Sequence, residues 1–288
     1  MIVAVGSQAD AVDRNRLTLM KLSDLVRTGV GRDKSEKELE DEIMGPEYNK
    51  DEDSDDDDDD DEEEEEEMVD LDPVLEHYNL KHMGGINRVR AMPQSPEIIA
   101  TWSDTGVVNL YNVKGILENF QRSATNATSS SLDTKQRSVK TTKIERDPFF
   151  VYQGHETEGY AMDWSRVSRG HLATGDCHGH VHLWQPTEGG GTTSYNTSTS
   201  FRVKPAYGPS SDSNIDNPSI EDIQWSPTEA TVLAVAECGG YVKIYDTRCD
   251  GRAMLSQKIH ENKADVNVIS WNPIVSNLLA SGRDDGEL

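Results

Sequence analysis

The sequence is poor in cysteine, in positive charge and in long apolar runs. Its 288 residues include 3 cysteines and no Cys-x-x-Cys pair. The N-terminus does not read as a secretory signal, so three cysteines indicate free thiols in a reducing compartment. No stretch approaches the ~18 consecutive apolar residues of a membrane-spanning helix. We therefore expect no membrane partner.

The charge is strongly one-sided. Lys and Arg number 28 against 53 Asp and Glu, which gives a formal net charge of −25. Such a chain repels phosphate, which argues against sequence-specific binding of nucleic acid and favours a basic partner. Hydrophobic residues make up only 34%, but 5 Trp and 9 Tyr argue against a wholly disordered chain. We expect a folded body with polar inserts.

Much of the acid lies in residues 51–67, where Ser54 is the single interruption. Like charges at this density cannot bury enough apolar surface to offset the entropy of ordering, so we expect a disordered acidic insert over residues 28–72. The run can neutralise a basic protein without fixed geometry; the alternative is a solvated spacer that only aids solubility. The carboxylates that form this candidate binding tract are Asp51, Glu52, Asp53, Asp55, Asp56, Asp57, Asp58, Asp59, Asp60, Asp61, Glu62, Glu63, Glu64, Glu65, Glu66 and Glu67. Ser54 is a candidate phosphorylation site among acids.

The remainder of the chain is predicted to be all-β and to repeat itself. Residues 1–25 contain two apolar runs that fit two strands. Residues 84–288 contain similar units, each with several short strands, and three of them have a tryptophan that ends the first strand: Trp164, Trp225 and Trp271. The polar stretches near 123–142 and 189–217 are interpreted as long disordered loops. One unit cannot bury both faces of its small sheet, whereas radial stacking of units does so, as in a β-propeller.

These units resemble the WD-repeat family, whose period is ~40–45 residues. A structural tetrad of His, Ser or Thr, Asp and Trp is expected in that family. The resemblance implies such a tetrad at His155, Thr174 and Trp184, with His178 at the usual position of Asp, and a second one at His260, Ser281 and Asp285. A further unit has Val235, Gly239 and Tyr245 instead.

The resemblance can be narrowed to one branch of that family. The phrases Gly84-Gly85-Ile86-Asn87-Arg88 and Leu183-Trp184-Gln185-Pro186-Thr187, with the acidic run before the first unit, are similar to the glutamate-rich WD-repeat proteins, relatives of the histone-binding retinoblastoma-associated propellers. This implies a non-enzymatic factor of nucleus and nucleolus, without a cofactor. It would bind a basic large-subunit ribosomal protein and histones, and would act on assembly intermediates of the large ribosomal subunit. Relatives carry more blades, so we expect about four blades of an incomplete propeller here.

Two other functions stay open. One is a histone-binding subunit of a chromatin complex. The other is an adaptor that presents substrates to a ubiquitin ligase, because Tyr245-Asp246-Thr247-Arg248 is close to a Trp-Asp-x-Arg docking motif.

Metal binding and catalysis are weaker interpretations. A metal cluster could be imagined from His171, Cys177, His178, His180 and His182, and a hydrolase triad from His155, Thr174 and Asp176. The repeat pattern accounts for the same residues, and no nucleophile elbow surrounds a serine. We expect no metal and no catalytic residue.

Overall fold

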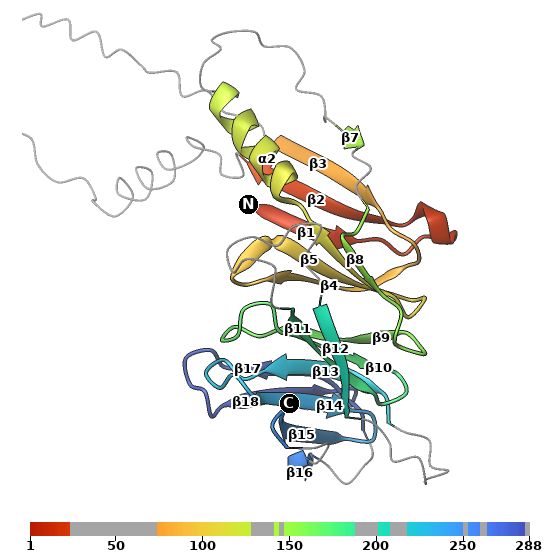
Figure 1. The fold of residues 1–288 in the computed structure, drawn as a ribbon, viewed down its shortest axis with the longest axis vertical. Helices are drawn as coiled ribbons and strands as arrows, with labels where there is room; N and C mark the ends of the chain where they lie inside the picture. Colours follow the sequence, from red (N-terminus) through yellow and green to blue (C-terminus); the bar gives the residue numbers. More distant parts are fainter. Residues whose placement is uncertain are drawn as a thin grey trace, which may run out of the picture.

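The computed structural model describes residues 1–23, 74–127, 141–143, 147–187, 201–207, 218–249, 253–259 and 264–285. The acidic insert expected over 28–72 lies outside these residues. Within the described part, strands form four four-stranded sheets and one two-stranded sheet, here called A to E in chain order. The sheets follow one another in a row (Figure 1). No helix in the described residues combines the length and apolar character needed to cross a membrane.

Sheet A lies at the N-terminal end of the row. It contains β1 (Ile2–Gly6), β2 (Arg16–Ser23), β3 (Val74–Lys81) and β7 (Thr141–Lys143), and a 3-10 turn, η1 (Val12–Arg14), lies between the first two strands. The two strands expected within residues 1–25 are therefore β1 and β2, which pair as an antiparallel hairpin. Leu17 and Leu19 of β2 are buried and alternate with half-buried neighbours, as period-two burial requires.

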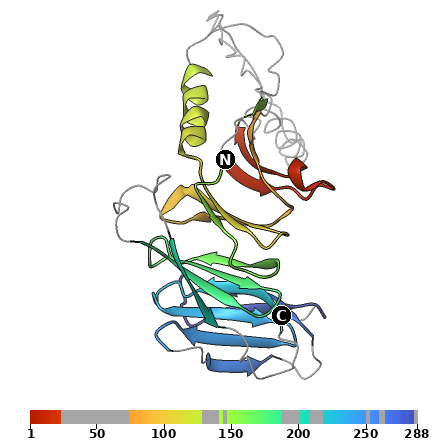
Figure 2. The same cartoon turned by 45° about the vertical axis from the view of Figure 1, so that its right-hand side comes forward.

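Sheet B contains the only described α-helix between two of its strands. The strands are β4 (Ile86–Met92), β5 (Ser95–Ser103), β6 (Val108–Asn112) and β8 (Phe150–Tyr152), and the helix is α2 (Lys114–Ala127). Ile116 and Phe120 of α2 are buried, and the Phe120 ring meets the edge of Tyr78 in sheet A at 5.0 Å, so α2 lies beside sheet A (Figure 2). The prediction of a loop near 123–142 is therefore wrong at both of its ends. Residues 123–127 continue the helix, and β7 begins at Thr141.

The last three sheets complete the row. Sheet C contains β9 (Gly159–Trp164), β10 (Leu172–Asp176), β11 (Val181–Pro186) and β12 (Phe201–Tyr207). Sheet D contains β13 (Ile220–Trp225), β14 (Val232–Glu237), β15 (Tyr241–Asp246) and β16 (Ala253–Lys258), and sheet E contains β17 (Val266–Trp271) and β18 (Leu279–Arg283). The loop expected near 189–217 is wrong at residues 201–207, because these form β12 and pair with β11.

The apolar core is divided into layers, one between each pair of neighbouring sheets. The layer between sheets B and C contains Trp102, Trp164 and Trp184, none more than 1% exposed. Strands β10 and β14 are buried along almost their whole length, because a neighbouring sheet covers each of their faces. Stacking therefore buries both faces of each inner sheet, as the repeat pattern predicts.

The first strands of consecutive sheets, β4, β9, β13 and β17, lie side by side along one flank of the row. The packing of sheet B on sheet C requires a small residue at Gly159, where a Cβ atom would lie 2.5 Å from the Gly175 carbonyl oxygen of β10 and 2.6 Å from the Trp102 ring of β5. The β10–β11 turn in turn needs Gly179, whose φ is +81°.

Candidate functional site

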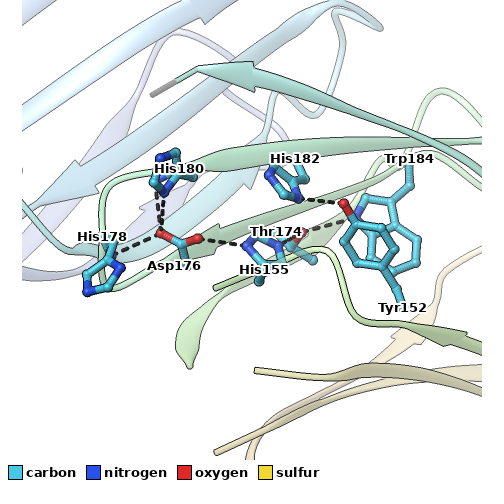
Figure 3. A network of polar contacts seen from close by, with 8 residues as sticks. All are labelled: Tyr152, His155, Thr174, Asp176, His178, His180, His182 and Trp184. Carbon is cyan, nitrogen blue, oxygen red and sulfur yellow. Dashed lines mark hydrogen bonds and ion pairs between the residues drawn. The ribbon is translucent and has the colours of Figure 1, made fainter. Parts of the chain in front are cut away.

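A network of buried polar side chains spans the inside of sheet C (Figure 3). His155 lies just before β9, Thr174 on β10 and Trp184 on β11. The Nε2 atom of His155 lies 2.8 Å from the Thr174 hydroxyl, and the Trp184 indole donates to that hydroxyl at 3.0 Å. These three residues, which the resemblance groups in one tetrad, are thus in contact.

Asp176 completes this network at the end of β10. Its Oδ2 atom lies 2.9 Å from Nδ1 of His155, and its Oδ1 accepts the backbone N–H groups of His178 and His180 at 3.0 and 2.9 Å. Burial would raise the pKa of Asp176, but the hydrogen bonds from His155 and His180 outweigh burial and lower it. The expectation that His178 takes the aspartate position is wrong, because Asp176 faces His155 and the side chain of His178 is exposed.

A second histidine stacks on the first. The His182 ring lies 4.0 Å from the His155 ring at an interplanar angle of 17°, and its Nδ1 atom lies 2.8 Å from the Tyr152 hydroxyl. Burial, reinforced by the neighbouring His155, lowers the pKa of His182 to about 4. His182 is therefore neutral at physiological pH.

The order Thr174–His155–Asp176 is that of a hydroxyl, a base and a carboxylate. However, the Thr174 hydroxyl is fully buried and already contacts both His155 and Trp184. A substrate would have to displace the layer of tryptophans to reach it. This arrangement is suited to tying the segment between β8 and β9 to β10 and β11 with satisfied hydrogen bonds.

The histidines of this region do not converge on one point. His171 lies against the Trp225 ring at 6.4 Å, whereas His155 and His182 stack inside sheet C. Across the described residues, no group of three or more His, Cys, Asp or Glu side chains is arranged to hold a metal ion.

Sheet B contains a related network that sequence reasoning missed. His82 Nε2 lies 2.9 Å from the Thr101 hydroxyl, and the two residues are 19 positions apart, the same separation as His155 and Thr174. The Asn109 amide lies 3.2 Å from the same ring nitrogen, and Tyr111 stands where sheet C has Trp184. That shared separation is the signal that could have identified His82.

Sheet D replaces the network with an ion pair. Val235 and Tyr245 stand at the positions of Thr174 and Trp184. Two residues after Val235, the buried Glu237 pairs with Nζ of Lys243 at 2.6 Å. Burial raises the pKa of Glu237, and the ammonium of Lys243 opposes that rise.

Sheet E shows only part of the second predicted tetrad. Ser281 lies on β18 opposite Ile269, and Asp285 pairs with Nε of Arg283 at 3.3 Å. His260 lies outside the described residues, as does the whole acidic tract 51–67 with Ser54.

Carboxylates also gather at one end of the first strands of sheets C, D and E. We call Glu158, Glu221 and Asp265 the acidic rim. Glu221 accepts from the Cys238 thiol at 3.1 Å, and Asp265 accepts from the Gly239 N–H at 2.5 Å. Burial, together with Glu221 and Asp265, raises the pKa of Cys238 to about 12. The rim therefore carries a negative potential and holds its neighbouring thiol protonated.

Known proteins are similar in sequence to this chain over most of its length. The chain is 34% identical over 259 residues to Protein HEAT STRESS TOLERANT DWD 1 of Arabidopsis thaliana, and 35% identical over 254 residues to Glutamate-rich WD repeat-containing protein 1 of Dictyostelium discoideum. It is 31% identical over 276 residues to Ribosome assembly protein rrb1 of Schizosaccharomyces pombe. These alignments cover 89%, 86% and 94% of this chain.

The chain is similar to these WD-repeat and ribosome assembly proteins over most of its own length. The all-β propeller class expected from its repeats is confirmed: sheets A to E follow one another along the chain, as the sheets of a WD-repeat propeller do. The chain spans 48%, 42% and 45% of the lengths of these three relatives. No family model matches it.

Proposed function

We propose that this WD-repeat chain is a non-enzymatic binding scaffold and acidic chaperone in assembly of the large ribosomal subunit. Its client is a basic ribosomal protein, with histones as a second class of basic partner. A similar protein is named a ribosome assembly protein, and this supports a place in the nucleolus and nucleus, where such intermediates form.

The observation that carries the proposal is the charge of residues 51–67. Each exposed ion pair contributes only ~0–1 kcal/mol, but sixteen carboxylates in one run engage many cationic side chains at once. The acidic rim adds carboxylates at one end of the first strands of sheets C, D and E. The acidic tract and the acidic rim are both negatively charged, as the binding of a basic client requires.

Salt dependence tests the tract directly. In a binding titration with a purified basic ribosomal protein, the parent chain should lose affinity steeply with salt, because the screening length falls from ~8 Å at physiological salt to ~3 Å at 1 M. Replacing residues 51–67 by neutral Gly and Ser should weaken binding at low salt and flatten the slope. Parallel titrations with core histones and with a lysine-rich peptide show whether the chain prefers the ribosomal protein, binds histones as well, or binds any basic chain.

The matched control keeps the charge and changes the order. Scrambling Asp and Glu within residues 51–67 should leave affinity and salt slope unchanged, because the tract requires no fixed geometry. Equal slopes for the parent and the neutral variant would show that the tract is only a solubilising spacer.

A second candidate function, that of a ubiquitin-ligase adaptor, rests on Arg248. Its side chain is 74% exposed just after β15, and its Nε atom contacts both carboxylate oxygens of Asp246 at 2.9 and 3.0 Å. Hydrogen bonds from Arg248 lower the pKa of Asp246. The arginine is thus presented at the surface in a fixed orientation. If this function holds, Arg248→Ala should abolish capture of a ligase subunit without altering the salt slope for basic clients.

A further inference from the structure

The first strand of sheet D is tied to that of sheet E by one amide side chain. Gln224 Oε1 accepts the backbone N–H of Trp271 at 2.8 Å. Its Nε2 donates to the carbonyl oxygen of Ile269 at 2.8 Å. Gln224 therefore binds one donor and one acceptor of β17.

Asp163 holds the same place one sheet earlier. Like Gln224, it directly precedes the tryptophan that ends its strand, and its Oδ2 accepts the N–H of Trp225 at 2.9 Å. Ile223 lies two residues before Trp225, as Ile269 lies two before Trp271. The carbonyl of Ile223 in β13 therefore corresponds to the carbonyl of Ile269 in β17, to which the Gln224 amide donates. A carboxylate has no hydrogen to donate to a carbonyl, whereas a neutral carboxyl has one.

We propose that Asp163 is a proton-sensitive clasp between sheets C and D. In its neutral form it holds both backbone groups of β13, as Gln224 holds those of β17. In its ionised form it holds only the N–H of Trp225, and the seam between the two sheets is weakened.

The surroundings of Asp163 favour this behaviour. Burial raises the pKa of Asp163 to about 6. Asp222 on β13 adds to the rise, whereas the N–H of Trp225, Arg90 on β4 and Arg166 after β9 oppose it. The carboxyl thus titrates in the weakly acidic range.

The sign of the effect follows from linkage. Because the folded pKa lies above the ordinary value of 3.8, the stability that the neutral form provides is complete below pH 3.8 and is lost as pH rises through about 6. A difference of about two units between the folded and unfolded pKa values corresponds to a ~100-fold change in the folding equilibrium constant. Asp163 keeps some contact with solvent, which reduces the expected effect to about 10-fold.

Asp222 supplies a matched control. Its two oxygens each accept a backbone N–H at 3.0 Å, one from Ile223 and one from Ile269, and Arg88 lies 3.9 Å away. Both oxygens are thus used as acceptors. An asparagine here would direct its NH₂ group at an N–H, whereas at position 163 it would imitate the neutral carboxyl.

The test compares Asp163→Asn and Asp222→Asn by denaturant unfolding of the chain at pH 5 and pH 7.5. We expect Asp163→Asn to raise the folding equilibrium constant about 10-fold at pH 7.5 and to reduce its change between the two pH values. Hydrogen exchange of the Trp225 amide should slow at pH 7.5. Asp222→Asn should destabilise at both pH values.

The proposal is overturned if Asp163→Asn destabilises the chain at both pH values or prevents folding. Gln224→Glu is an independent check. It should give the D–E seam the same loss of stability with rising pH, and an unchanged pH profile for this variant would also count against the clasp.

Discussion

At the scale of single residues, the Thr174 hydroxyl is the centre of the sheet C network. It is fully buried and contacts both His155 and Trp184. Removing either partner therefore costs the hydroxyl one of its two hydrogen bonds at a place that water cannot reach, and that is more costly than the loss of an exposed hydrogen bond.

His155→Ala tests this role. The change leaves the Thr174 hydroxyl with the Trp184 indole alone and removes the imidazole from the buried Asp176 carboxylate, so we expect the free energy of unfolding to fall by about 2–3 kcal/mol. Denaturant titration measures the change. His178→Ala is the control, because that side chain is exposed, and it should stay within ~0.5 kcal/mol. Unchanged stability with selective loss of client binding would instead make His155 a contact residue.

The sequence allowed most of this network to be predicted. The family resemblance groups His155, Thr174 and Trp184, which are in contact, but puts His178 at the position that Asp176 occupies. The physical reason is strand periodicity: residues i and i+2 of a strand point to the same face, so Asp176 follows Thr174 toward His155. His178 lies beyond the strand, in the β10–β11 turn.

At the scale of one element, sheet D keeps the strand pattern and changes the chemistry. The Glu237–Lys243 pair lies where sheet C has Asp176 and His182. Lys243→Met should lower the free energy of unfolding by about 2–3 kcal/mol, because it leaves a buried carboxylate without a counter-charge. Unfolding at pH 7 measures this loss.

A double variant provides the control for that ion pair. Glu237→Leu combined with Lys243→Met removes both charges and should recover most of the lost stability, because an apolar pair of similar volume needs no desolvation of ions. A double variant as unstable as the single one would show that packing, not charge, decides the result.

Helix α2 was missed because its signal is short and lies beside a polar stretch. The apolar residues Ile116, Leu117 and Phe120 have helical spacing, but the Ser- and Thr-rich residues that follow favour a loop by composition. Packing on sheet A decides the outcome, since α2 covers Leu17 and Leu19 in a shared core layer.

At the scale of the whole molecule, Arg88 links three sheets. From β4 in sheet B, its Nε donates to the carbonyl of Tyr160 in sheet C, and its guanidinium lies 3.9 Å from Asp222 in sheet D. Repeats predict the order of the sheets, but no local pattern predicts a contact between residues so far apart in the chain.

Arg88→Met should therefore weaken the row as a unit. We expect a loss of about 2 kcal/mol, because the buried Asp222 loses the guanidinium that pairs with it and keeps only the weaker influence of Arg90. Unfolding followed by tryptophan fluorescence and by circular dichroism measures the loss and tests whether the transitions still coincide. Arg166→Met, at an exposed arginine nearby, is the control. Equal stability of the two variants would contradict the linking role.

The turns between the first three strands of sheets B, C and D are short, whereas the chain runs from 113 to 149 before β8 and from 187 to 200 before β12. Lengthening a connection between two strands is cheap, at ~0.6 kcal/mol for each doubling of its length. The connection before β8 already contains α2, which covers the core of sheet A, and β7, which pairs with β3. The connection before β12 is therefore the better insertion point, and a fluorescent protein placed there would report on the scaffold without entering its core.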